Sequence, residues 1–199
     1  MEISPVADEL IQAGRRLHEM GMVPASSGNL SMRLDDGNYA VTRSGVHKGY
    51  LEPNDILTVD ASGQSYDQRV PSAETLLHLQ IYRFFPQVEV VFHVHSKYAT
   101  LLSFTEQEKI IIKNYELLKA LPGITTHAAA ITVPIFKNDQ NIKRMSSEVE
   151  QYMKAEPDIK TYLIRGHGFY CWAKDMVSAL NQIEALEFMF ACEFERGNY

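Results

Sequence analysis

The sequence is poor in cysteine and contains no long apolar run. Among 199 residues there are two cysteines, Cys171 and Cys192, which excludes a framework of disulfide bonds and favours a reducing compartment. A membrane-spanning helix needs about 18 or more consecutive apolar residues, and no such run occurs. The first residues, MEISPVADEL, lack the basic and apolar segments of a signal peptide. We therefore expect a cytoplasmic protein that does not bind membranes.

An excess of basic residues is also missing. The chain has 19 Lys and Arg against 25 Asp and Glu, a net charge of −6, which argues against nucleic acid as a partner. With 45% hydrophobic and 22% charged residues it can bury a substantial core. We find no internal repeat, low-complexity tract or linker, so a single domain over residues 1–199 is expected.

Helical and strand patterns alternate along the whole chain. Amphipathic spacing predicts helices over 4–20, 71–85, 114–121, 138–156 and 175–195. Apolar or β-branched runs bounded by turn residues predict strands over 30–34, 39–43, 55–60, 90–94, 130–136, 161–164 and 169–172. This alternation predicts an α/β fold in which helices cover both faces of a sheet. The order of the strands does not follow from it.

Two histidines stand two residues apart within VVFHVHS, residues 90–96. On a strand such residues point to the same face, roughly 6.5–7 Å apart, so His93 and His95 can converge on one ion. A zinc site of the catalytic type has three protein ligands and one open position. His167, between two glycines in IRGHGFY, is the candidate for the third. A tight turn with a solvated histidine is the alternative, and spacing alone leaves both open.

Two polar stretches have the composition of an anion site. They are ASSGNLS, residues 25–31, and TRSGVHKG, residues 42–49, and Ser72 lies at the N-terminus of the helix predicted over 71–85. Backbone N–H groups, hydroxyls and one lysine are a common way to hold a phosphate ester. The candidates are Gly28, Asn29, Ser44, Gly45, Lys48 and Ser72. Each stretch alone is equally compatible with a polar turn.

Two carboxylates complete the set of candidate residues. Glu74 begins the helix after PSA, where a negative charge also stabilises the helix dipole. Glu116 lies beside leucines in NYELLKAL, where a solvated helix face is the alternative.

Six stretches carry a resemblance to a known family, in the order in which that family has them. They are SSGNLSMRL, TRSGVHKGYL, PSAETLLH, VVFHVHSKYAT, NYELLKAL and LIRGHGFYCW. From about Leu10 to Glu195 the chain resembles the class II aldolase and adducin superfamily, and most of all its branch of dehydratases in methionine salvage. The resemblance implies a three-layer α/β/α fold with a central mixed, largely antiparallel sheet. It also implies a homotetramer with sites near the subunit boundaries.

The resemblance assigns roles to the candidate residues. It implies that His93, His95 and His167 bind Zn²⁺, one ion per subunit, and that Glu116 is the catalytic acid/base. Glu74 stands where the aldolase branch keeps its catalytic carboxylate. The five candidates of the two polar stretches, together with Ser72, match phosphate-binding positions.

The implied reaction is the dehydration of 5-methylthioribulose 1-phosphate to 2,3-diketo-5-methylthiopentyl 1-phosphate. Zinc would assist the loss of the C3 proton as a Lewis acid, and Glu116 would protonate the departing C4 hydroxyl. Its leucine neighbours are expected to raise the pKa of its carboxyl by desolvation. The alternatives are a zinc-dependent sugar-phosphate aldolase of the fuculose or ribulose phosphate type and a non-catalytic adducin-like scaffold.

Overall fold

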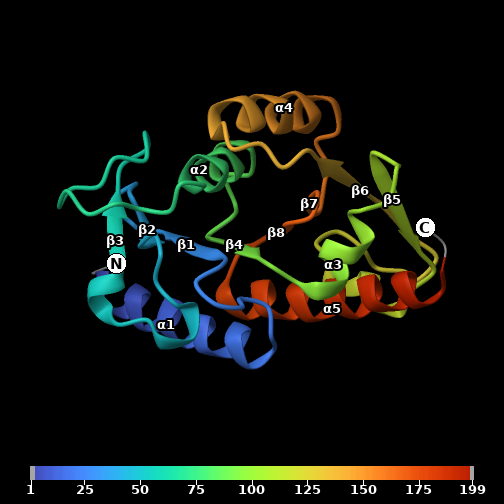
Figure 1. Ribbon diagram of the computed structural model, residues 1–199, viewed down its shortest axis with the longest axis horizontal. Helices are drawn as coiled ribbons and strands as arrows, with labels where there is room; N and C mark the ends of the chain where they lie inside the picture. Colours follow the sequence, from blue (N-terminus) through green and yellow to red (C-terminus); the bar gives the residue numbers. More distant parts are fainter. Residues whose placement is uncertain (1–2, 198–199) are drawn as a thin grey trace.

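The computed structural model describes residues 3–197, so residues 1, 2, 198 and 199 of the expected domain lie outside it. Eight strands form one sheet in the order β3-β2-β1-β4-β8-β7-β6-β5 (Figure 1). The strands are β1 (Asn29–Arg33), β2 (Tyr39–Thr42), β3 (Ile56–Val59), β4 (Val90–Val94), β5 (Lys109–Lys113), β6 (Ala130–Phe136), β7 (Tyr162–Ile164) and β8 (Gly168–Ala173). The helices are α1 (Ile3–Glu19), α2 (Thr75–Phe84), α3 (Lys97–Leu102), α4 (Ile142–Ala155) and α5 (Met176–Glu195), with 3-10 turns η1 (Lys48–Tyr50), η2 (Pro53–Asp55) and η3 (Glu116–Ala120).

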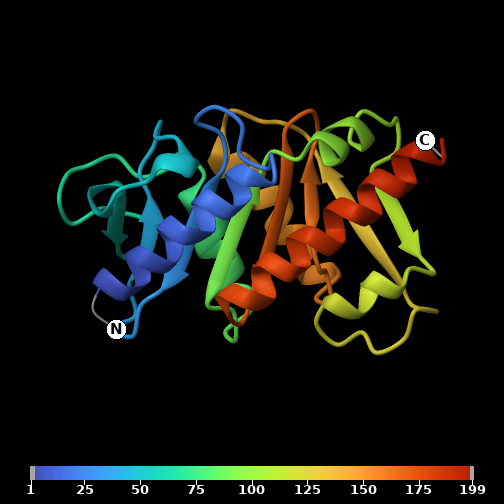
Figure 2. The same ribbon diagram turned by 90° about the horizontal axis from the view of Figure 1, so that it is seen from below.

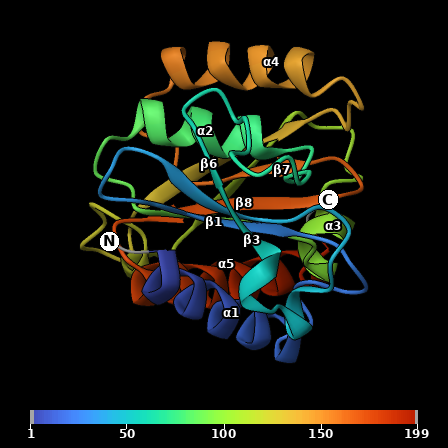
Figure 3. The same cartoon turned by 90° about the vertical axis from the view of Figure 1, so that its left-hand side faces the viewer.

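The sheet is mixed and largely antiparallel, as expected. Only β6 and β7 pair in parallel among the described strands. Helices α2 and α4 cover one face, and α1, α3 and α5 cover the other (Figures 1 and 3). Each face has its own hydrophobic core, because residues along a strand point alternately to the two sides. The three-layer α/β/α prediction is confirmed.

Strand β4 shows how this alternation aims a functional side chain. Val90, Phe92 and Val94 enter the core under α1 and α5, whereas Val91 enters the core under α2 and α4. His93 therefore points to the side of α2. All five residues of the strand are buried, so the ring is held inside the protein rather than in solvent.

Two elements were not predicted from the sequence, and one was predicted as the wrong type. Strand β5 was missed because its consecutive isoleucines conceal an alternation in which Ile110 and Ile112 are buried and Ile111 is exposed. Helix α3 was missed because it has six residues, too few for a periodic pattern. The helix predicted over 114–121 is the 3-10 turn η3, five residues long. No helix within residues 3–197 is long and apolar enough to cross a membrane.

Candidate metal centre

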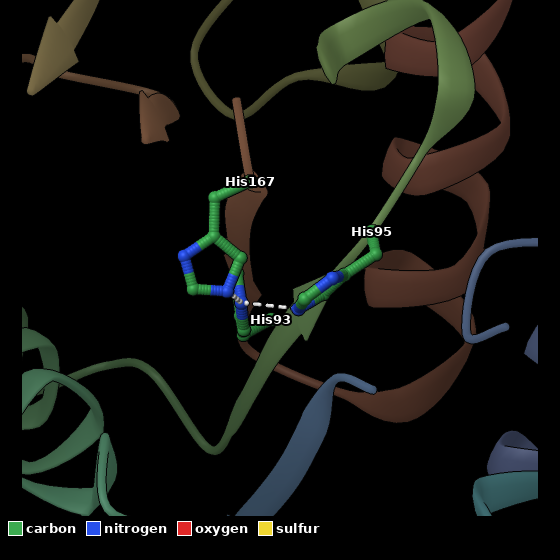
Figure 4. A group of neighbouring side chains, drawn as sticks. All are labelled: His93, His95 and His167. Carbon is green, nitrogen blue, oxygen red and sulfur yellow. Dashed lines mark hydrogen bonds between the residues drawn. The ribbon is translucent and has the colours of Figure 1, made fainter. Parts of the chain in front are cut away.

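Strand pairing brings three histidines together from two distant segments. His93 lies in β4 and His95 directly follows it, whereas His167 lies in the turn between β7 and β8. Strands β4 and β8 pair with Val94 opposite Phe169, which places that turn beside the end of β4. The Nε2 atom of His93 lies 3.1 Å from that of His95 and 3.3 Å from that of His167 (Figure 4). The three rings face one another.

The hydrogen bond on the other side of His93 determines its tautomer. Its Nδ1 lies 3.1 Å from the carbonyl oxygen of Phe169, which only accepts, so Nδ1 carries the proton. In the neutral ring Nε2 then presents a lone pair to the other two histidines. Burial lowers the pKa of His93 well below its ordinary value and that of His95 to about 3. Both rings are therefore neutral, the form that binds a metal.

The geometry fits a divalent metal ion. For zinc bound tetrahedrally at 2.0–2.1 Å, two ligand nitrogens are about 3.3 Å apart. The two distances from His93 match this spacing, and in residues 3–197 this is the one group of three or more His, Cys, Asp or Glu side chains close enough to share an ion. The lone pair of His93 Nε2 points to the place where the Nε2 atoms of His95 and His167 also converge, and this arrangement suits an ion between the three rings.

Glu74 lies against this centre. It occupies the position before α2, and its Oε2 lies 3.4 Å from Nε2 of His93. The other oxygen, Oε1, lies 3.9 Å from Nε2 of His167 and is buried without a hydrogen-bond partner. The Asn29 amide donates to Oε2 over 2.8 Å, which holds one side of the carboxylate and leaves the other side available.

Two glycines allow the segments of the centre to approach this closely. A Cβ atom on Gly168 would lie 2.1 Å from the carbonyl oxygen of Val94, and one on Gly28 would lie 2.8 Å from that of His93. Gly28 also has φ = +73°, a conformation that side chains rarely adopt. Glycine at these positions is thus required by the contact with β4 itself.

All six predicted substrate residues line one cavity of about 260 Å³ together with Glu74, His95 and His167. They are Gly28, Asn29, Ser44, Gly45, Lys48 and Ser72. The cavity also takes in residues that sequence reasoning missed. Arg43 precedes Ser44, and its charge could have marked it, although it pairs with Asp55 at 2.9 Å. Residues 138–140, after β6, carry no signal in the sequence because only the fold brings them here.

Lys48 is a buried cation in this cavity. Its ammonium donates to the carbonyl oxygens of Ser26, at 3.0 Å, and Val46, at 2.6 Å. Two of its three protons are thus used, and one remains for a ligand. Burial lowers the pKa of Lys48 to about 8, although Asp55 opposes the shift.

Glu116 does not share this cavity. Its side chain is 70% exposed and forms an ion pair of 2.5 Å with Lys119. The expectation of a raised pKa is wrong, because the hydrogen bond from Lys119 lowers the pKa of Glu116 and outweighs the opposing effect of desolvation. Of its leucine neighbours, Leu118 is buried in the core.

The 3-10 turn that carries Glu116 lies at the other end of the strands. Lys119 and the residues that follow it line a separate cavity with Val88 and Ala173. Ala173 pairs with Val90 at the start of β4, whereas His95 follows the end of that strand. Figure 2 shows η3, in yellow, and α3, in green, at these opposite ends. Within one chain the structure brings together every predicted site residue except Glu116.

Comparison with known proteins gives the same family at the level of sequence. The family described as Class II Aldolase and Adducin N-terminal domain matches residues 8–194. The methylthioribulose-1-phosphate dehydratase of Methylococcus capsulatus is 52% identical over 192 residues, 96% of this chain and 94% of that protein. The enzyme of the same name from Pseudomonas syringae pv. tomato is 46% identical over 197 residues, 98% of this chain and 97% of that protein.

Solved structures share the fold. The YgbL protein of Escherichia coli superimposes with a TM-score of 0.84 at 26% identity, over 100% of this chain and 92% of that one. The L-fuculose-1-phosphate aldolase of Thermus thermophilus superimposes with a TM-score of 0.78 at 22% identity, over 98% of this chain and 96% of that one. The second likeness concerns the fold alone.

Proposed function

This chain belongs to the class II aldolase and adducin family, and we infer that within it the chain is a hydro-lyase that dehydrates 5-methylthioribulose 1-phosphate. The product is 2,3-diketo-5-methylthiopentyl 1-phosphate, and the reaction is a step of methionine salvage. The observation that carries this inference is the 52% identity to a dehydratase of that name over 96% of the chain. A scaffold has no need of three converging histidines with a buried carboxylate beside them, which argues against the adducin-like alternative.

We propose Zn²⁺, one per chain, as the ion held by His93, His95 and His167. Spacing of the ring nitrogens and the neutral state of His93 and His95 support this proposal. The bound ion would supply Lewis-acid polarisation of the carbonyl next to the carbon that loses its proton. Metal analysis of the purified protein tests it, and less than about half an equivalent of any divalent metal per chain would contradict it.

The substrate phosphate would occupy the polar part of the 260 Å³ cavity. We propose that Ser44, Gly45, Lys48 and Ser72 bind it, with Gly28 allowing the backbone to approach. Lys48 retains one proton for the phosphate, and Ser72 lies just before α2, where backbone N–H groups also favour an anion. The amide of Asn29 already contacts Glu74, so we propose that Asn29 positions this carboxylate instead of binding the phosphate.

We propose that the two carboxylates divide the proton transfers. Glu74 lies beside the three rings, and its unpartnered Oε1 would accept the C3 proton. Glu116 would protonate the departing C4 hydroxyl, but only from a second copy of the chain, because within one chain it lies at the other end of the sheet. We accordingly propose a homotetramer of single-domain subunits in the cytoplasm.

The test is an assay of purified, metal-replete protein with 5-methylthioribulose 1-phosphate, in which the 2,3-diketone product is measured. A His95→Ala variant is the control, and its activity should vanish together with its metal. Release of dihydroxyacetone phosphate instead of the diketone would show carbon–carbon cleavage, and the aldolase alternative would replace the dehydratase.

A further inference from the structure

Behind Glu74, four buried polar side chains form a hydrogen-bonded network. None of these side chains forms a hydrogen bond with a proposed metal ligand. Asn29 and Ser31 come from β1, and His78 and Tyr82 come from successive turns of α2. None of the four residues is more than 5% exposed. Asn29 pairs with His93 and Ser31 with Val91 in the sheet register, so both side chains point to the side of α2. Water does not compete for these groups.

In this network each side chain donates a hydrogen bond to the next one toward Glu74. An ionised carboxylate only accepts, so the Asn29 group that contacts Glu74 at 2.8 Å is the NH₂, and its Oδ1 faces His78. Nε2 of His78 must then carry the proton that it donates to Oδ1. The opposite nitrogen, Nδ1, accepts from the Ser31 hydroxyl at 2.7 Å. Ser31 in turn accepts from the Tyr82 hydroxyl at 2.8 Å.

The opposite set of donors and acceptors is disfavoured at Tyr82, the residue of the network farthest from Glu74. It would make Ser31 donate to Tyr82, whose own proton would then need another acceptor. Among the described residues Ser31 is the hydrogen-bond partner of that hydroxyl, and a buried donor without an acceptor is costly. Burial also lowers the pKa of His78 to about 3, so the ring is neutral and has one proton to place.

We propose that His78 is a positioning residue for the reaction: its Nε2–H fixes the Asn29 amide, which holds Oε2 of Glu74 and leaves Oε1 to meet the substrate. The catalytic consequence rests on the proposed function, but the arrangement of the side chains does not. Groups that orient the residues of a metal site in this way typically change activity about 10- to 100-fold when removed.

Two variants of similar polarity separate a positioning role from a merely structural one. In His78→Gln the side-chain amide reaches the place of Nε2 and keeps a donor for Asn29. In His78→Asn the amide ends near the place of Nδ1, keeps a partner for Ser31 and loses the contact with Asn29. Both replace a buried ring by a smaller amide. The asparagine is one methylene shorter and loses more packing, so Tm and metal content are measured together with kcat.

The experiment combines kinetics of the metal-replete enzyme with a readout that needs no activity. We expect kcat of His78→Asn to fall at least about tenfold with KM changed less than about threefold, and His78→Gln to recover most of kcat. The two variants should bind equal amounts of metal, and His78→Asn should melt only a few degrees lower because of its missing methylene. Equal kcat in the two variants would overturn the proposal.

The second readout is the tautomer of His78 in ¹⁵N-histidine-labelled protein, assigned by its loss in His78→Gln. We expect the Nε2–H form at neutral pH, and the Nδ1–H form would overturn the network. A crystal structure of His78→Asn with Asn29 and Glu74 unmoved would overturn the positioning role even if the wild-type protein proved inactive. Absence of dehydration by the wild type would contradict the proposed function alone.

Discussion

The buried Lys48 makes a quantitative prediction about how phosphate binding depends on pH. Its ammonium is a buried cation that the cavity offers to an anion, and burial lowers its pKa to about 8. An ordinary lysine, with a pKa near 10.4, stays charged throughout the neutral and mildly alkaline range. Lys48 instead loses its charge as the pH rises through about 8, so affinity for a phosphate ester must fall over that range.

The size of the effect follows from the fraction of the protein that carries the ammonium. With a pKa of about 8, this fraction is about 0.9 at pH 7 and about 0.1 at pH 9. Affinity for the dianion of a phosphate monoester, whose second pKa is about 6, should therefore weaken about tenfold between these two values. For an unperturbed lysine the change would be less than about 1.1-fold.

The assay is titration calorimetry with a non-reactive alkyl phosphate monoester at a series of pH values. Lys48→Met is the matched control, because it keeps the length of the stem and cannot titrate. Dividing the wild-type affinity by that of the variant removes the contribution of every other group. A ratio that stays constant from pH 7 to pH 9 would refute the role of Lys48 in the phosphate site or its lowered pKa.

Further predictions concern the carboxylates and the close strand contact. Glu74→Gln should retain metal and lose about 100- to 10,000-fold in kcat, and activity within tenfold of wild type would contradict its role. Mixing inactive Glu116→Gln and His95→Ala subunits should restore activity if the two residues meet across a subunit boundary, and mixtures as inactive as their parts would remove Glu116 from the site. Gly168→Ala should lower the free energy of unfolding, measured in urea, by about 1–3 kcal/mol and should reduce metal content, because its Cβ would press on the backbone of Val94. An unchanged free energy and metal content would contradict this contact.

Local patterns in the sequence were sufficient where the chemistry is local. His93 and His95 share a face because strand side chains alternate, and flanking glycines mark His167 as a residue in a tight turn. Polar turns with glycine and a lysine indicated residues that line one cavity, the one proposed to bind the phosphate. Alternation of helices and strands was enough for the layers of the fold, since each element needs a covered apolar face.

Other features depended on contacts between distant residues. Nothing near Glu74 in the sequence says that its carboxylate meets His93 and His167, because that contact depends on how α2 packs beside β4. Glu116 looked desolvated among its leucines, yet only the fold decides which side of η3 faces the core. His78 carried no signal of a role of its own, since a buried histidine on an apolar helix is ordinary until its partners are known. The sequence by itself determined which groups are available and on which face of an element they lie; the tertiary structure decided which of them are desolvated and within hydrogen-bond distance, because burial and distance are properties of packing between segments.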